Sequence, residues 1–171
     1  MSTWGRNNGE QTPKKNWSLE EARGKLETFC AYQERCIWEL RRKLFEKGIQ
    51  GQPVDKILAE LEASGFVDEE RFARSYARGK FRIKRWGKGR ISQELKLRQI
   101  SSTLIQLGLS EIDPEEYFAT LEREAEKKWE KTKEKDAYKK KYLVTQYLMS
   151  KGFEQDLIQE ALSALVSQGM E

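Results

Sequence analysis

The chain of 171 residues carries 32 Lys or Arg and 28 Asp or Glu, a net charge of +4, and charged residues make up 35% of it. Only three prolines are present, and the composition is rich in good helix formers, so it favours an all-α protein and excludes a strand-rich one. Histidine is absent, which removes the commonest general base and the commonest zinc ligand.

Residues 1–17 are polar and lack the apolar stretch of a secretory signal, so we predict a disordered N-terminal tail. No later segment approaches the roughly 20 apolar residues that cross a bilayer. We therefore expect a soluble, cytoplasmic protein without a membrane partner. Cys30 and Cys36 are six residues apart, a spacing that favours reduced thiols on a helix over a metal site.

One apolar pattern occurs three times along the chain. Its anchors are Ile49, Ile100 and Phe153, which are 51 and 53 residues apart. Apolar residues stand nine and five positions before each anchor, and five, nine and twelve positions after it. The repeat therefore has six shared positions. The remaining members are Leu40, Leu44, Val54, Leu58 and Leu61, then Ile91, Leu95, Ile105, Leu109 and Ile112, then Val144, Leu148, Ile158, Leu162 and Leu165.

The spacing within each copy predicts two helices joined by a tight turn. Steps of three and four residues keep side chains on one helix face, whereas the step of five at the anchor passes through a turn. Gly48 and Gly152 precede their anchors, where a glycine that ends a helix is expected. Gln99 replaces this glycine in the second copy, so we expect that turn to close differently.

A further helix is expected before each pair. Ser18, Asp68 and Asp113 are capping residues followed by acids in the first turn. In the second copy, steps of four, three and four residues predict the buried face of this helix. That face would consist of Phe72, Tyr76, Gly79 and Ile83.

The predicted fold is all-α, with three tandem three-helix, helix-turn-helix-like repeats at 18–67, 68–113 and 114–169 that form an elongated modular protein. The third repeat should open with a longer helix, because its first two helices span eight more residues, or about two turns. The mixed-sign segment 122–141 is predicted to be an exposed helix laced with salt bridges rather than a second nucleic-acid site.

Positive charge is concentrated in the second repeat. From Arg74 to Arg98 the chain carries ten Lys or Arg and one acid, a local net charge of +9. Five arginines recur at helical spacing and predict a stripe of about 21 Å along one helix, namely Arg71, Arg74, Arg78, Arg82 and Arg85. Such a stripe is typical of a polyanion-binding surface, although a solvated helix face is an alternative. The predicted nucleic-acid-binding residues are Arg71, Arg74, Arg78, Lys80, Arg82, Lys84, Arg85, Lys88, Arg90, Lys96 and Arg98.

The turn at 86–90, with the sequence WGKGR, interrupts this basic segment. Gly87 and Gly89 would let the backbone approach a phosphate, beside the charge of Lys88. Trp86 would stack on an unpaired base or, alternatively, pack between two helices. No bidentate pattern for reading bases is present, so we expect backbone contact with little sequence preference.

Residues 63–80 and 86–95, ASGFVDEERFARSYARGK and WGKGRISQEL, resemble the signature of the RecX family of bacterial recombination regulators. Two positions depart from the family pattern, which often has Gly-Pro at Gly87-Lys88 and Lys-Gly-Ile at residues 98–100. The matching residues are Gly65, Phe66, Asp68, Arg71, Phe72, Ala73, Arg78, Gly87, Arg90, Ile91 and Leu95.

The resemblance implies three tandem three-helix units and a regulatory protein that is not an enzyme and needs no cofactor or metal. Family members bind the RecA recombinase filament on single-stranded DNA and restrain its ATPase, strand-exchange and co-protease activities, in DNA repair and the SOS response. Some also bind DNA directly, so duplex DNA is a further candidate partner. Trp38, Tyr117 and Trp129 are candidates for RecA contact if they are exposed.

Two other interpretations stay open at this point. The first is an autonomous helical-repeat DNA-binding protein with little sequence preference and no RecA contact. The second is a helical-repeat adaptor for proteins alone, although the repeat period near 51 does not fit the usual 34-residue repeats. No arrangement of nucleophile, base and orienting group is recognisable, which argues against catalysis. We expect a monomer, because no segment resembles a coiled-coil seam.

Overall fold

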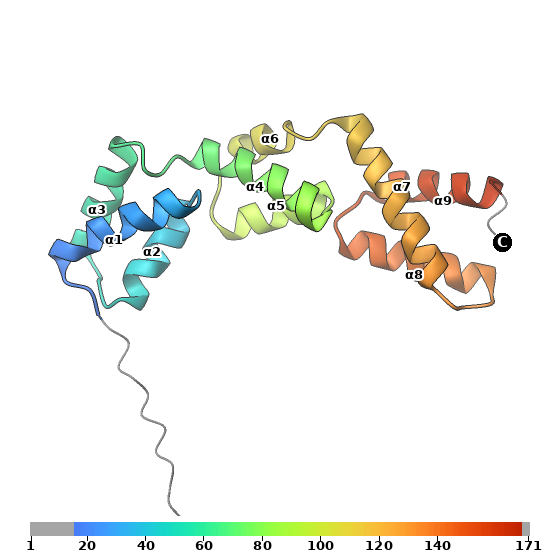
Figure 1. Ribbon diagram of the computed structural model, residues 1–171, viewed down its shortest axis with the longest axis horizontal. Coiled ribbons are helices and arrows are strands. Elements are labelled where there is room, and N and C mark those ends of the chain that lie inside the picture. The colour runs from blue at the N-terminus through green and yellow to red at the C-terminus, as the bar shows by residue number, and fades with distance from the viewer. Residues whose placement is uncertain (1–15, 169–171) are drawn as a thin grey trace, which may run out of the picture.

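The computed structural model describes residues 16–168. Within this range the chain forms nine α-helices and no strand, arranged three by three along an elongated molecule (Figure 1). This confirms the predicted all-α fold of repeated three-helix units. The helices are α1 (Leu19–Tyr32), α2 (Ile37–Glu46) and α3 (Gln52–Ala63), then α4 (Glu69–Lys84), α5 (Lys88–Leu97) and α6 (Ser102–Leu109), then α7 (Pro114–Lys131), α8 (Ala137–Ser150) and α9 (Gln155–Ser167).

The first helix of each repeat starts at its predicted capping residue. Ser18 Oγ accepts a hydrogen bond from the backbone of Glu21 at 3.2 Å, and the Glu21 carboxylate accepts one from the Ser18 N–H at 3.0 Å. The carboxylates of Asp68 and Asp113 likewise accept backbone N–H groups three residues later, each at 2.9 Å. Each such cap stabilises its helix by about 1 kcal/mol.

The repeated apolar pattern forms the interior of the molecule. Seventeen of its eighteen residues are buried, and only Leu109 is half-exposed. Repeat 1 has a core of its own, whereas the cores of repeats 2 and 3 are continuous. Cys36 and Trp38, at the start of α2, are the members of repeat 1 that pack with this second core. Repeat 1 is therefore the more separate unit.

The turn between the second and third helices is the same in all three repeats, so the prediction for Gln99 is wrong. Gln99 adopts a left-handed φ of 58°, where Gly48 and Gly152 have φ of 83° and 96°. The N–H of Ile100 donates to the carbonyl of Leu95 at 3.1 Å, as the matching residues do in the other repeats. The hydrogen bonds of the turn hold a side chain where glycine is less strained.

Helix α4 presents a different face to the core from the one predicted. Phe72 is buried as expected, but Ala73, Ala77 and Phe81 complete the face, and Ile83 is 75% exposed. The absence of a side chain on Gly108 allows α6 to approach α4, because a Cβ on Gly108 would lie only 2.7 Å from the Ala73 carbonyl oxygen. Close packing on alanine and glycine decides the orientation of α4, and it leaves Tyr76, Gly79 and Ile83 toward a surface groove.

The third repeat opens with the longest helix, but α7 exceeds α4 by only two residues, 18 against 16. The other extra residues lie in the link 132–136 and in α8, which has 14 residues where α5 has ten. The salt bridges expected along 122–141 are also absent from the described residues. The ion pairs of this segment all involve Glu124, and they run to Arg85 and Lys151 outside it.

Residues 1–15 of the predicted disordered tail lie outside the described residues, but Trp17 contradicts the prediction. Its backbone N–H donates to the carbonyl of Lys47 at 3.1 Å, and its ring packs against the core of repeat 1. Repeat 1 therefore includes Trp17. Between residues 16 and 168, none of the helices combines the length and apolar character needed to traverse a lipid bilayer.

Candidate nucleic-acid interface

The eleven predicted binding residues lie on α4, on the turn after it, on α5 and at Arg98 directly after α5. They divide into two groups by their partners. Five arginines form ion pairs with carboxylates, and we refer to them as the paired arginines: Arg71, Arg74, Arg78, Arg85 and Arg98. The other six form no ion pair with any residue in 16–168, and we refer to them as the unpaired cations: Lys80, Arg82, Lys84, Lys88, Arg90 and Lys96.

Two paired arginines join repeat 2 to repeat 1. Arg71 Nε lies 2.6 Å from Glu34 Oε1, and Arg98 Nε lies 3.3 Å from Glu39 Oε1. Arg98 also pairs with Glu94 on α5 at 3.1 Å. Because both partners in repeat 1 come from the corner between α1 and α2, these ion pairs fix that corner against the second repeat.

Arg74 and Arg78 share Glu111, which follows α6. The distances from their guanidinium nitrogens to the Glu111 carboxylate are 2.9 and 3.3 Å. The hydrogen bond from Arg74 lowers the pKa of Glu111, and the bond to Glu111 raises the pKa of Arg74. Arg23 and Glu60 form the equivalent pair in repeat 1 at 2.8 Å, each 51 residues earlier. Arg74 therefore has a structural partner that recurs with the repeat.

The glycines of the WGKGR turn approach another part of the protein rather than an anion. The N–H of Gly87 donates to the carbonyl of Lys151 at 2.7 Å, and the N–H of Gly89 donates to that of Gly152 at 2.9 Å. A Cβ on Gly87 would overlap the backbone of Gly152. The interpretation of these glycines as a phosphate contact is wrong, because their N–H groups connect repeats 2 and 3.

Tyr117 is central to the same junction. Its hydroxyl donates to Glu154 Oε2 at 2.6 Å and accepts the backbone N–H of Lys88 at 3.0 Å, while its ring packs against Phe81 and Phe153. Burial is the main cause that raises the pKa of Tyr117. Tyr117 is 3% exposed and Trp129 6%, so neither can contact a partner, and Trp38, which is half-buried, is the remaining candidate.

Three of the unpaired cations lie over aromatic rings. Lys80 and Arg90 flank the ring of Trp86 at 5.0 and 4.2 Å from its centroid, and Lys88 lies 4.9 Å from that of Tyr117. Trp86 itself is half-buried against the core, as the packing interpretation predicted. Cation–π contacts of this kind orient a charge without neutralising it, so these cations keep their charge for an anion.

The other three unpaired cations are exposed. Arg82 and Lys84 lie in the last turn of α4, and Lys96 lies in the last turn of α5. Cations at these positions interact favourably with the negative end of a helix, but an exposed ammonium or guanidinium group gains little from that. The end of α4 therefore carries the most accessible positive charge of the predicted site.

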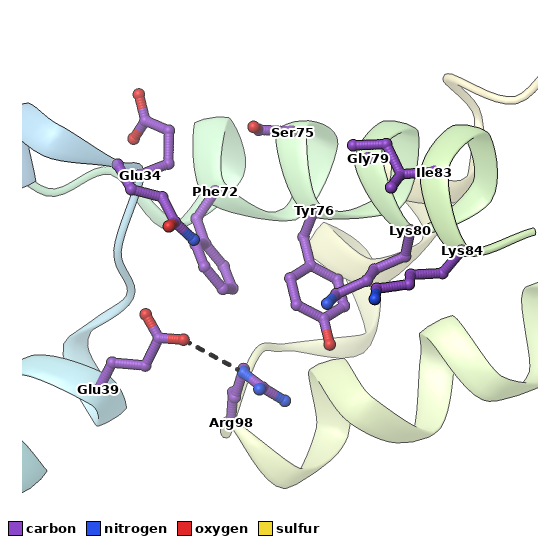
Figure 2. A pocket seen from close by; sticks show the side chains of 11 residues that line it. Glu34, Glu39, Phe72, Ser75, Tyr76, Gly79, Lys80, Ile83, Lys84 and Arg98 are labelled. Atoms are coloured by element: carbon purple, nitrogen blue, oxygen red, sulfur yellow. Dashed lines mark hydrogen bonds and ion pairs between the residues drawn. The ribbon is translucent and has the colours of Figure 1, made fainter. Parts of the chain in front are cut away.

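A groove of about 420 Å³ separates α4 from repeat 1. Figure 2 shows Tyr76, Lys80 and Lys84 extending from α4 on the side where Arg98 lies at the end of α5. Glu39 faces Arg98 across the groove, and the ion pair between them closes that side (Figure 2). Two carboxylates, Glu34 and Glu39, also line the groove, and each is paired with an arginine. The ring of Tyr76 and the cations Lys80 and Lys84 are the part of the lining that suits a base and its phosphate.

Sequence reasoning missed this groove and the acidic partners around it. Tyr76 was assigned to the buried face, and burial does raise its pKa, yet the residue lines the groove at half exposure. Glu34 and Glu111 each lie 37 residues from the arginine they pair with. For Glu111 a signal existed, because the Arg23–Glu60 pair has the same spacing one repeat earlier.

Family comparisons agree with the repeats. The model described as the second three-helix domain of RecX matches residues 68–109, and the third three-helix domain matches 115–162. The chain is 32% identical over 131 residues to regulatory protein RecX of Pelodictyon phaeoclathratiforme, covering 77% of this chain and 80% of that one. It is 33% identical over 129 residues to regulatory protein RecX of Haemophilus influenzae strain PittGG, covering 74% and 82%.

Solved structures share the fold. A crystal structure of regulatory protein RecX superposes with a TM-score of 0.77 at 23% identity, covering 85% of this chain and 71% of that one. RecX from Lactobacillus salivarius superposes with a TM-score of 0.74 at 20% identity, covering 86% and 96%. With two domain models, relatives above 30% identity and a common three-repeat fold in agreement, the chain belongs to the RecX family of regulatory proteins.

Proposed function

We propose that this protein regulates the RecA recombinase by binding its filament on single-stranded DNA. The expected effect is inhibition of the ATPase, strand-exchange and co-protease activities of RecA, during DNA repair and the SOS response in the cytoplasm. The observation that carries the proposal is the set of unpaired cations on repeat 2, in a chain of the RecX family. We propose that the protein acts as a monomer.

Within the predicted site, the two groups of cations have different roles in this proposal. The unpaired cations contact DNA phosphates, because their charge is not offset by a described carboxylate. The paired arginines chiefly hold the repeats together, since binding a phosphate there would compete with an ion pair already made. Phosphate contact is independent of sequence, so the protein should bind single strands with little base preference.

The elongated shape supports a mechanism on the filament (Figure 1). Repeat 2 would lie against DNA, while repeats 1 and 3 on either side would contact recombinase subunits. A protein that bridges neighbouring subunits opposes the cooperative changes that filament growth and ATP turnover need. Trp38 is a candidate for one of these protein contacts, because it lies half-exposed on repeat 1.

The proposal is tested with RecA ATP hydrolysis on single-stranded DNA, titrated with this protein at substoichiometric amounts. The wild-type protein should inhibit ATP hydrolysis by RecA. The Arg82→Glu/Lys84→Glu variant should lose inhibition and weaken DNA binding, because two exposed phosphate contacts become repulsive. The Lys25→Glu/Lys56→Glu variant changes the net charge equally on exposed positions of repeat 1 and is the matched control for DNA binding.

Two results would contradict the proposal in different ways. If the wild-type protein binds single-stranded DNA but leaves RecA hydrolysis unchanged, the autonomous DNA-binding protein is the better account. If reversing Arg82 and Lys84 has no more effect on DNA affinity than the repeat 1 control, the unpaired cations of α4 are not the contact. A steep salt dependence with equal affinity for duplex and single strand would also favour the autonomous binder.

A further inference from the structure

A second cationic cavity lies where repeat 2 meets repeat 3. Its volume is about 340 Å³, within the range of roughly 300–1,000 Å³ for ligand pockets. Five cations and one carboxylate line it, a net charge of +4. The charged residues are Arg85 after α4, Lys127, Lys128 and Lys131 on α7, Lys151 after α8, and Glu124 on α7.

Glu124 organises the deep side of this cavity. The carboxylate is nearly buried, with its side chain 7% exposed, and it lies 3.4 Å from Arg85 Nε and 3.2 Å from Lys151 Nζ. The single negative charge of Glu124 is thus shared between two cations, Arg85 and Lys151. Arg85 contacts Glu124 through Nε at ion-pair distance without forming a hydrogen bond, since Glu124 Oε1 has no hydrogen-bond partner. Its two terminal nitrogens can therefore donate to an oxyanion, the fork geometry that suits phosphate.

The cavity lysines on α7 form no ion pair with an acid in the part of the chain that the structure describes. Lys127 and Lys131 are exposed, and Lys128 lies 4.5 Å from the ring centroid of Tyr147. Like charges held together in this way repel one another at the cost of stability, unless an anion joins them. Their convergence with Arg85 and Lys151 therefore points to an anionic ligand.

We infer that this cavity binds phosphate groups of a nucleic-acid strand that continues from α4 onto repeat 3. Arg82 and Lys84, in the last turn of α4, immediately precede Arg85 at the cavity, so positive charge is continuous from one repeat to the next. The inference rests on the proposed function, because it extends the proposed DNA path.

The test uses the full chain and fluorescence anisotropy of a labelled single-stranded oligonucleotide over a salt series. Each lost phosphate contact reduces the slope of log affinity against log salt by about 0.7 for single strands. The Lys127→Gln/Lys131→Gln variant should therefore reduce the slope by about 0.7 to 1.4. The Lys25→Gln/Lys56→Gln variant removes the same charge from exposed positions of repeat 1 and should leave the slope unchanged.

The outcomes separate this inference from the proposed function. If substitution at Lys127 and Lys131 matches the repeat 1 control while Arg82→Gln/Lys84→Gln weakens binding, the cavity does not hold the strand, and the proposed function stands. If the wild-type protein does not bind single-stranded DNA, both fail.

Acetylation of lysines in the absence and presence of the oligonucleotide provides a second readout that needs no substitution. Lys127 and Lys131 should be protected by DNA, whereas Lys25 and Lys56 should not be. Equal protection by inorganic pyrophosphate at the same phosphate concentration would overturn the assignment to a strand, because the cavity would then bind isolated phosphates.

Discussion

The close approach of Gly87 to Gly152 predicts that Gly87→Ala destabilises the junction between repeats 2 and 3. The added Cβ would overlap the backbone carbon and oxygen of Gly152. The junction must open by on the order of 1 Å before the atoms reach the roughly 3.5 Å of ordinary contact. That displacement breaks the hydrogen bonds from Gly87 to Lys151 and from Gly89 to Gly152, now 2.7 and 2.9 Å long.

Each of these hydrogen bonds contributes about 1 kcal/mol net, and overpacking adds about 1–3 kcal/mol. The free energy of unfolding should therefore fall by about 3–5 kcal/mol. With an m value of about 2 kcal/mol per molar urea, the midpoint of urea unfolding followed by circular dichroism should fall by about 1.5–2.5 M. The same variant should bind DNA more weakly if repeat 3 carries part of the strand.

Gly24→Ala is the matched control, because nothing lies within 4 Å of a Cβ at this exposed position of α1. Alanine should stabilise that helix by about 0.5–1 kcal/mol. If Gly87→Ala unfolds at the same urea concentration as the wild-type protein, the junction is not held by this close approach, and the reasoning from the glycine contacts is refuted.

Three further predictions concern single positions. Gln99→Gly should stabilise the protein by about 0.5–1 kcal/mol, because glycine relieves the left-handed φ of 58°; a lower melting temperature would contradict this. Burial raises the pKa of Cys36 to about 11 from 9.0, so the thiol's contribution to stability is intact below pH 9 and lost as the pH rises to about 11. Between neutral pH and about pH 10, the free energy of unfolding of the wild-type protein should fall by about 1 kcal/mol more than that of Cys36→Ala, measured by urea unfolding. An equal pH dependence of the two proteins would exclude the effect. A double-mutant cycle between Arg71 and Glu34 should give a coupling energy below about 1 kcal/mol that decreases with added salt, because both side chains are partly exposed, and a larger, salt-independent value would contradict the surface assignment.

The three-repeat fold could be predicted because the spacing of apolar residues along the chain indicates which side chains are buried. The positions around Ile49, Ile100 and Phe153 were chosen by spacing alone, and nearly all of them are buried. The turn at Gln99 was mispredicted because glycine preference is only a preference, of about 1 kcal/mol, and the same hydrogen bonds close the turn with another side chain.

The binding site could be predicted only in part, because a local count of charge omits partners that are distant in the sequence. Arg71 and Arg74 contribute to the predicted stripe, yet Arg71 pairs with Glu34, which lies 37 residues away. Arg74 pairs with Glu111 at the same separation, in addition to Glu70 on its own helix. The turn around Gly87 has the glycine-rich composition of a phosphate-binding loop, but the N–H of Gly87 donates to a backbone carbonyl in the next repeat. The sequence predicts that the lysines of α7 lie on an exposed helix, because nothing in their own segment indicates that Arg85 and Lys151 lie beside them.

The two junctions between repeats are held by different interactions, so the junction between repeats 1 and 2 should bend more easily than the junction between repeats 2 and 3. Repeats 2 and 3 share backbone hydrogen bonds and a continuous core, neither of which salt weakens. Repeat 1 is attached through a small apolar corner and the ion pairs of Arg71 and Arg98, which salt screens. Added salt should therefore change the orientation of repeat 1 relative to repeats 2 and 3, which stay together as one body. Small-angle scattering should show this as a change in the longest dimension of the molecule.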